Sequence, residues 1–422
     1  MSEITEDAVQ AEVRAWLEAN WSPDQGLVEW REKLIDAGWG APAWPQRWGG
    51  RELAPAMAAV VDQELRRVGA VNVARAGIRT LASATLLAHG TDWQKQKFLR
   101  RSLTGEDAWC QLFSEPGSGS DLAGAMTRAE RQPDGRWIVN GQKVWTTSAH
   151  HADWGLLLAR TDMDLPKHQG LTFFVLDMRQ PGVEVRPLRQ MNGHASFNQV
   201  FFTDAVVPAE HLVGEIGGGW AVATTTLMHE RRGADGSGSV GAGAQATERV
   251  GRIYDEERAE VATVMEPYRW YPQRAGRVDL VIQRAKETGK LADPVVRQEI
   301  ARLLTLARSA EWTARRARAA MAEGRPPGPE GSLGKLAASH VARAAARVHT
   351  LISGADAMLS GEDGPHGGTI AEILISVPAV SIAGGTDEIQ RNIIAERVLR
   401  MPKEPGSDAD RPFRDVPRNV AG

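Results

Sequence analysis

The chain has 422 residues, 42% of them hydrophobic and 24% charged, which is enough for two or three packed subdomains. Its formal charge of −3 gives no broad positive field for nucleic acid or an anionic membrane, and no uncharged apolar stretch reaches the ~20 residues that span a bilayer. The acidic N-terminus does not resemble a signal peptide, and there is a single cysteine, Cys110, so we expect a cytoplasmic protein without disulfides.

The first hundred residues are predicted to be helical. Val9, Val13, Trp16 and Leu17 recur at helical spacing, and residues 53–86 are rich in Ala, Leu, Val and Arg. We therefore predict an N-terminal helical domain over residues 1–107.

From about Trp109 the chain alternates short β-rich runs with turns. Asp134-Gly135 separates two of these runs, and Asn140-Gly141 is a further tight-hairpin signal. Because no helical periods lie between the runs, a small antiparallel barrel or sandwich is predicted over residues 108–219. The strand candidates are residues 127–130, 136–139, 155–159, 171–176, 183–187 and 199–203.

Helical periodicity returns at Trp220. Long Ala/Arg/Leu-rich segments at 295–321 and 335–352, and an amphipathic one at 387–400, predict a C-terminal helical domain over residues 220–402. The charged, Pro-rich residues 403–422 are predicted to form a flexible tail. The predicted fold class is α+β, with the order helical domain, β-domain, helical bundle.

Three further motifs do not require a functional site. Residues 236–241 match the GxGxxG spacing of a dinucleotide loop, but they follow a helix-like run rather than a strand. His150-His151 lacks the spacing of a metal site, so we expect no metal. Cys110 lies in an apolar run without a neighbouring base, which favours a buried core thiol over a nucleophile.

Two stretches are more informative. Residues 112–124 (LFSEPGSGSDLAG) form a strand end and a Gly/Ser loop, whose N–H groups and hydroxyls suit a heterocycle or phosphate, although a surface turn explains them equally well. Residues 141–148 (GQKVWTTS) place Trp145 beside two threonines. This tryptophan offers a stacking face, and a core-filling role is an equal alternative.

Together with residues 190–193 (QMNG), 201–208 (FFTDAVVP) and 384–395 (GGTDEIQRNIIA), these motifs resemble those of the acyl-CoA dehydrogenase family. The likeness spans residues 5–402, with the motifs in the family's order. It implies FAD bound between the β-domain and the C-terminal helices, and an acyl-CoA substrate.

The resemblance also assigns roles to single residues. Phe113 and Ser114 would meet the flavin pyrimidine, Trp145 would pack on the isoalloxazine, and Thr147 would donate towards N5 and O4. Ser120 would face the pantetheine or phosphate part of the substrate. The remaining cofactor contacts would come from Thr386 and Glu388, and, from a neighbouring subunit, from Gln298, Thr350 and Gly354. Residues 286–297 depart from the family pattern, which weakens the assignments from the neighbouring subunit.

The family's chemistry needs a carboxylate to remove the α-proton. Many members carry it immediately before the C-terminal Gly-Thr pair, where this chain has Gly384. A second subgroup carries it in a Glu-Arg pair on the first helix of the C-terminal domain, where Glu230-Arg231 stands. The resemblance therefore implies Glu230 as general base, with Arg231 near the substrate. The alternative is that Glu230 is an ordinary helix carboxylate that pairs with Arg231.

The leading hypothesis is an FAD-dependent acyl-CoA dehydrogenase that forms a trans-2-enoyl thioester and reduces an electron-transfer flavoprotein. The family suggests a homotetramer, with a hetero-oligomer as the other arrangement. One rival is a flavin monooxygenase or oxidase on the same fold, which uses O₂. Another is a subunit without a base in a hetero-oligomer, which Gly384 and the unusual region 254–284 favour.

Overall fold

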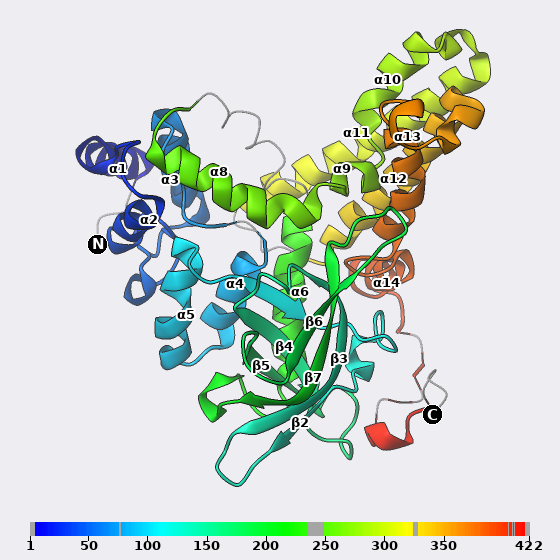
Figure 1. Ribbon diagram of the computed structural model, residues 1–422. Coiled ribbons are helices and arrows are strands. Elements are labelled where there is room, and N and C mark those ends of the chain that lie inside the picture. The colour runs from blue at the N-terminus through cyan, green and yellow to red at the C-terminus, as the bar shows by residue number, and fades with distance from the viewer. Residues whose placement is uncertain are drawn as a thin grey trace.

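The computed structural model describes residues 5–417 apart from 76, 235–248, 324–327, 404, 407 and 409, and the side chains of 231–234, 321 and 322. Within this range, helices are followed by a sheet and then by helices again (Figure 1). The predicted order of elements is confirmed. The GxGxxG stretch at 236–241 lies outside the described residues.

Five helices build the N-terminal region. The first begins where the Thr5 hydroxyl accepts a hydrogen bond from Ala8 N, and it buries Val9, Val13 and Leu17 on one face. That face packs into a core rich in tryptophan. The helices are α1 (Glu6–Asn20), α2 (Leu27–Asp36), α3 (Pro55–Val68), α4 (Arg79–His89) and α5 (Asp92–Thr104).

The middle region is one eight-stranded sheet with the order β6-β7-β3-β2-β4-β5-β8, and β1 joins it through β4. Most strand pairs are antiparallel as predicted, but β1 and β2 both run parallel to β4. The strands are β1 (Trp109–Leu112), β2 (Arg128–Arg131), β3 (Trp137–Thr147), β4 (Trp154–Arg160), β5 (Leu171–Asp177), β6 (Val183–Leu188), β7 (Phe197–Val207) and β8 (Leu212–Val213).

The two hairpin signals had different outcomes. Asp134-Gly135 does connect β2 to β3. The hairpin expected at Asn140-Gly141 was wrong, since β3 continues through both residues with a register shift there. Glycine is needed because a Cβ on Gly141 would lie 2.7 Å from Thr127 Cα.

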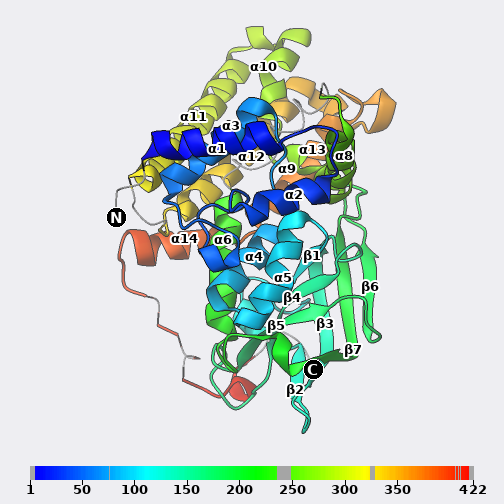
Figure 2. The same cartoon turned by 90° about the vertical axis from the view of Figure 1, so that its left-hand side faces the viewer.

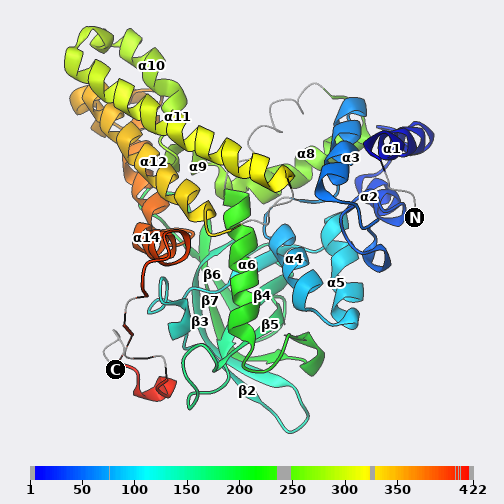
Figure 3. The same cartoon turned by 180° about the vertical axis from the view of Figure 1, so that it is seen from behind.

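The central strands are apolar on both faces. Leu156 and Leu158 of β4 face a core shared with α4, α5 and α6 (Gly219–Ala234), whereas Leu157 and Ala159 face a second core built from β3, β5 and β7. Figures 2 and 3 show these helices against the sheet. Cys110 is fully buried in the second core, which confirms that it is a buried core thiol. Burial raises the pKa of this thiol.

The C-terminal region is helical. The predicted long helices at 295–321 and 335–352 are confirmed as α11 and α12, which pack along each other. The helix predicted over 387–400 changes pitch, because α14 passes into a π-helical turn at Ile394–Val398. The helices are α6 (Gly219–Ala234), α8 (Arg252–Met265), α9 (Tyr271–Arg274), α10 (Val278–Glu287), α11 (Pro294–Ala322), α12 (Gly331–Ser353), α13 (Thr369–Ser376) and α14 (Asp387–Ile393).

Helix α8 joins the two helical regions. Its Tyr254 belongs to the N-terminal core, and its Glu260 forms ion pairs with Arg31 at 2.6 Å and Arg79 at 2.9 Å. A carboxylate shared by two buried guanidinium groups is well compensated. The boundaries predicted at residues 107, 219 and 402 remain predictions, and α8 packs against the first of these ranges although it belongs to the third.

Within the predicted tail, residues 412–416 pack against the rest of the chain. In the expected flexible tail, Phe413 is only 2% exposed and packs against the middle region. None of the helices in the described residues is long and apolar enough to cross a membrane.

Candidate active site

The two informative motifs, residues 112–124 and 141–148, meet where β1 and β3 end. Ser114, which follows β1, accepts a hydrogen bond through its carbonyl from Val144 N at 2.9 Å, and Phe113 O accepts one from Lys143 Nζ at 2.8 Å. The SEPGSGSD loop therefore begins directly beside the residues that precede Trp145.

A buried ion pair fixes this junction. Lys143 is fully buried with its Nζ 2.8 Å from Glu115 Oε1, and Glu115 also accepts hydrogen bonds from Met126 N and Thr127 N. Burial opposes ionisation of Glu115, but the Lys143 charge and these hydrogen bonds outweigh it and hold the pKa of Glu115 below its ordinary value. The loop and β3 are thus locked together.

Trp145 is held open at the end of β3. Its backbone φ is +61°, its side chain is 57% exposed, and only Phe197 lies against the ring, edge-on at 5.8 Å, among the ring contacts of the described residues. A bulky residue at positive φ stores backbone strain. The Oγ1 of the next residue, Thr146, is buried without a hydrogen-bond partner in the described part of the chain, and Thr147 is half-buried. An open indole face suits a planar heterocycle.

Aromatic rings continue from Trp145 into the C-terminal region. Phe197 lies 6.2 Å from Trp270, which lies 5.0 Å from Tyr271, which lies 4.9 Å from Tyr268. Trp270 is buried and donates through Nε1 to Ser196 Oγ at 3.1 Å. We call these five residues the aromatic cluster.

Glu230 lies at the other end of this cluster. It is half-buried on α6 and accepts a hydrogen bond from Gln111 Nε2 of β1 at 3.2 Å. The pKa of Tyr268 is raised by burial and by the charges of Tyr271 and Glu230. Burial also raises the pKa of Tyr271, and the Glu230 charge adds to it although Arg274 opposes the shift. Glu230 is therefore bound to β1, and its charge acts on both tyrosines of the cluster. The side chain of Arg231 lies outside the described residues.

Thr386 and Glu388 lie at the start of α14. The Thr386 hydroxyl caps this helix by accepting from Ile389 N at 3.2 Å, and the exposed Glu388 pairs with Arg391. The neighbouring Asp387 is buried and fastens this turn to α12 through Ser339 and Arg343.

Gln298, Thr350 and Gly354 are not brought to Trp145. All three are exposed on α11 or at the end of α12. At 1.5 Å per residue, Thr350 lies ~10 Å further along α12 than Arg343, which contacts α14.

Ser120 is exposed in a loop that is fastened on both sides. Ser118 Oγ donates to Asp121 O at 2.5 Å, and Asp121 pairs with Lys167 of the β4–β5 loop at 3.1 Å. Sequence reasoning missed Gln111 and the Lys143–Glu115 pair. Their signals were a polar residue between the apolar Cys110 and Leu112 on β1, and a lysine directly before Val144 and Trp145 on β3.

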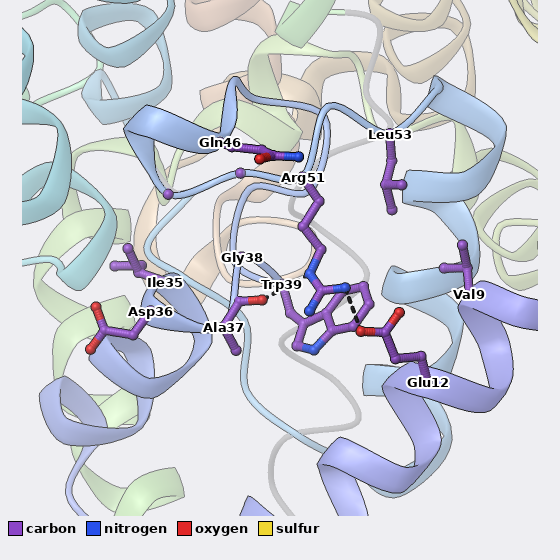
Figure 4. Close-up of a pocket in the computed structure, with 12 residues that line it drawn as sticks. Val9, Glu12, Ile35, Asp36, Ala37, Gly38, Trp39, Gln46, Arg51 and Leu53 are labelled. Carbon is purple, nitrogen blue, oxygen red and sulfur yellow. Dashed lines mark hydrogen bonds and ion pairs between the residues drawn. The ribbon is translucent and has the colours of Figure 1, made fainter. Parts of the chain in front are cut away.

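A separate pocket of about 380 Å³ opens on the N-terminal region and contains none of these residues (Figure 4). The guanidinium of Arg51 lies across it, 3.5 Å from the Trp39 ring centroid, and binds Glu12 at 2.6 Å and Ala37 O at 2.9 Å. We interpret this side chain as a brace between α1 and the loop after α2.

Three domain descriptions of one family match the chain. They are "Acyl-CoA dehydrogenase, N-terminal domain" at residues 1–106, "middle domain" at 110–205 and "C-terminal domain" at 273–399. Solved structures with the same fold include "Tcur3481-Tcur3483 steroid ACAD", with a TM-score of 0.65, 25% identity, and coverage of 94% of this chain and 98% of that one.

Among curated relatives, acyl-CoA dehydrogenase IpdE1 of Mycobacterium tuberculosis is 32% identical over 94% of this chain and 97% of its own length. Acyl-CoA dehydrogenase FadE34 of the same organism is 36% identical over 88% of this chain, which spans 46% of that longer protein. The fold and the site therefore define a member of the class of oxidoreductases that act on CH–CH groups. The chain belongs to the acyl-CoA dehydrogenase family.

Proposed function

We propose that this chain binds FAD and oxidises the Cα–Cβ bond of an acyl-CoA thioester to the trans-2-enoyl-CoA, with an electron-transfer flavoprotein as electron acceptor. The observation that carries the proposal is the position of Glu230 on α6, where its carboxylate accepts a hydrogen bond from Gln111 of β1 and its charge acts on Tyr271. The alternative acid position is filled by Gly384, which has no side chain and a φ of +69°.

The residues at the sheet edge fit the isoalloxazine of FAD. Trp145 offers an open face, Thr147 a hydroxyl two residues further along β3, and Phe113 and Ser114 the adjoining backbone. Thr386 and Glu388 would meet the rest of the cofactor at the start of α14. When bound, FAD supplies the acceptor for the β-hydrogen.

Glu230 removes the α-proton of the thioester in this proposal. The Gln111 amide orients the carboxylate by a hydrogen bond, and the half-buried rings of Tyr268 and Tyr271 lie close enough for its charge to act on their hydroxyls. Ser120 would contact the CoA part of the substrate, and Arg231 would lie near the acyl end.

The proposal includes an oligomer. Helix α11 exposes the apolar side chains of Val295, Leu304 and Trp312, the last with 63% of its surface, and exposed apolar side chains of this size favour a subunit interface. In a homotetramer, Gln298, Thr350 and Gly354 of one subunit would complete the FAD site of another. A hetero-oligomer is the alternative, since a solved structure of this fold is entitled "ChsE4-ChsE5 complex".

The words "steroid ACAD" in the name of one similar structure favour a ring-bearing acyl group as substrate. The test is anaerobic titration of the purified yellow protein with straight-chain, branched and steroid-side-chain CoA thioesters. We expect one class to bleach the flavin absorbance and electron-transfer flavoprotein to restore it.

Reduction of the flavin only by an external reductase would contradict the proposal and favour a monooxygenase. A colourless protein that gains flavin only with a second kind of subunit would favour the hetero-oligomer.

A further inference from the structure

Arg160, the last residue of β4, joins two loops from the inside. It is 1% exposed and donates to Ala125 O at 3.2 Å, to Lys167 O at 2.7 Å and to Ala123 O. A buried guanidinium needs such acceptors because it has lost its hydration. Arg160 therefore holds the loop that follows Ser120 against the β4–β5 loop, residues 161–170.

The C-terminal segment, residues 412–416, covers this arginine. Phe413 N donates to Leu165 O and Arg414 N to Met163 O, both at 3.0 Å, and Pro412 forms a bridge with Pro166. The Phe413 ring lies with its centroid 3.6 Å from the Arg160 guanidinium carbon. A cation–π contact that is shielded from water is among the stronger ones.

These contacts reach Ser120 over a short distance along the chain. The carbonyl groups of Ala123 and Ala125, which Arg160 holds, belong to the same turn as Asp121, and Asp121 is fastened to Lys167. Removing the Phe413 ring would expose one face of Arg160 to water and let the guanidinium leave its carbonyl acceptors. The loop with Ser120 would then lose its inner support.

We propose that Phe413 and Arg160 are positioning residues for the substrate: the C-terminal segment locks the Ser120 loop in the shape that receives the CoA part of the thioester. This inference rests on the proposed function. Glu230 lies on α6 and Trp145 on β3, so the segment governs substrate binding rather than the chemical step or flavin retention.

The test uses full-length Phe413→Ala. We expect the KM for acyl-CoA to rise about tenfold, with kcat and flavin content within about twofold of wild type, because only binding contacts are lost. Phe413→Tyr keeps the ring and should restore the wild-type KM. Arg414→Ala, which removes only the exposed ion pair with Asp164, is the matched control and should leave KM unchanged.

A second readout needs no turnover. Gly124 N and Ala125 N donate within the supported turn, so their amide hydrogen exchange should quicken in Phe413→Ala and not in Arg414→Ala. Unchanged amide exchange would overturn the proposal. A fall in kcat and in flavin content as large as the rise in KM would also overturn it. If the wild type reacts with no acyl-CoA, the proposed function fails. The exchange experiment still tests whether Phe413 and Arg160 support the Ser120 loop.

Discussion

Tryptophan serves opposite purposes in two regions of this molecule. In the N-terminal core Trp30 is fully buried, donates to Val71 O at 2.6 Å and packs edge-on against Trp21 at 4.7 Å. At the sheet edge Trp145 stands mostly exposed on a strained backbone. The first ring has all its partners within the chain. The second keeps a face for a partner that the chain does not supply, and backbone strain that persists is typical of functional sites.

The largest expected effect separates these two roles. Trp30→Ala should lower the free energy of unfolding by about 3–5 kcal/mol, since it leaves a cavity in a packed core. Trp145→Ala should change it by less than about 1 kcal/mol, since the ring is exposed. Chemical denaturation of both variants without added flavin measures the difference.

Flavin retention should follow the reverse order. We expect Trp145→Ala to lose its yellow colour on gel filtration and Trp30→Ala to retain it where folded. If Trp145→Ala binds flavin as tightly as the wild type, Trp145 has no role as a stacking surface.

A smaller effect sharpens the comparison through pH. A hydrogen bond from Arg14, with others from Arg67 and Gln10, lowers the pKa of Glu64 from 4.5 to about 2 and ties α1 to α3. A carboxylate whose pKa is lowered in the folded state stabilises the fold at pH values above its unfolded pKa. This stabilisation is lost as the pH falls towards the folded pKa. Acid should therefore weaken the N-terminal core between pH 4.5 and about 2.

We expect this carboxylate to contribute about 2 kcal/mol, since its arginine partners are partly exposed. Glu64→Gln should remove that share of the pH dependence, measured by urea unfolding at a series of pH values. If the stability of Glu64→Gln falls with acid as steeply as that of the wild type, Glu64 is not the source of this pH dependence.

The sequence predicts those features that local periodicity encodes. Helices α11 and α12 and most strands were predicted within a few residues, because their apolar spacing is regular, whereas the N-terminal region was predicted to be helical without the bounds of its helices. The hairpin at Asn140-Gly141 failed because local turn preference takes no account of Thr127, against which Gly141 packs. The docking of Phe413 could not be predicted, since its partner Arg160 lies far away in the chain.

The candidate site follows the same division. Trp145, Ser114 and Phe113 could be found from contiguous motifs, and the structure places them together. Gln111 and the aromatic cluster depend on contacts between distant segments. Tyr268 and Tyr271 lie in the region 254–284, whose sequence is unusual, but the sequence does not indicate that their hydroxyls feel the charge of Glu230.

The central claim is that Glu230 removes the α-proton, and Glu230→Gln tests it directly. In D₂O, with the reactive thioester, we expect the variant to keep its flavin, to lose α-proton exchange and to turn over about 10²–10⁴-fold more slowly. The control is Glu311→Gln, a change to an exposed α11 carboxylate that pairs with Arg308 and Arg315, and it should behave as the wild type. Near-normal exchange and turnover in Glu230→Gln would contradict the account.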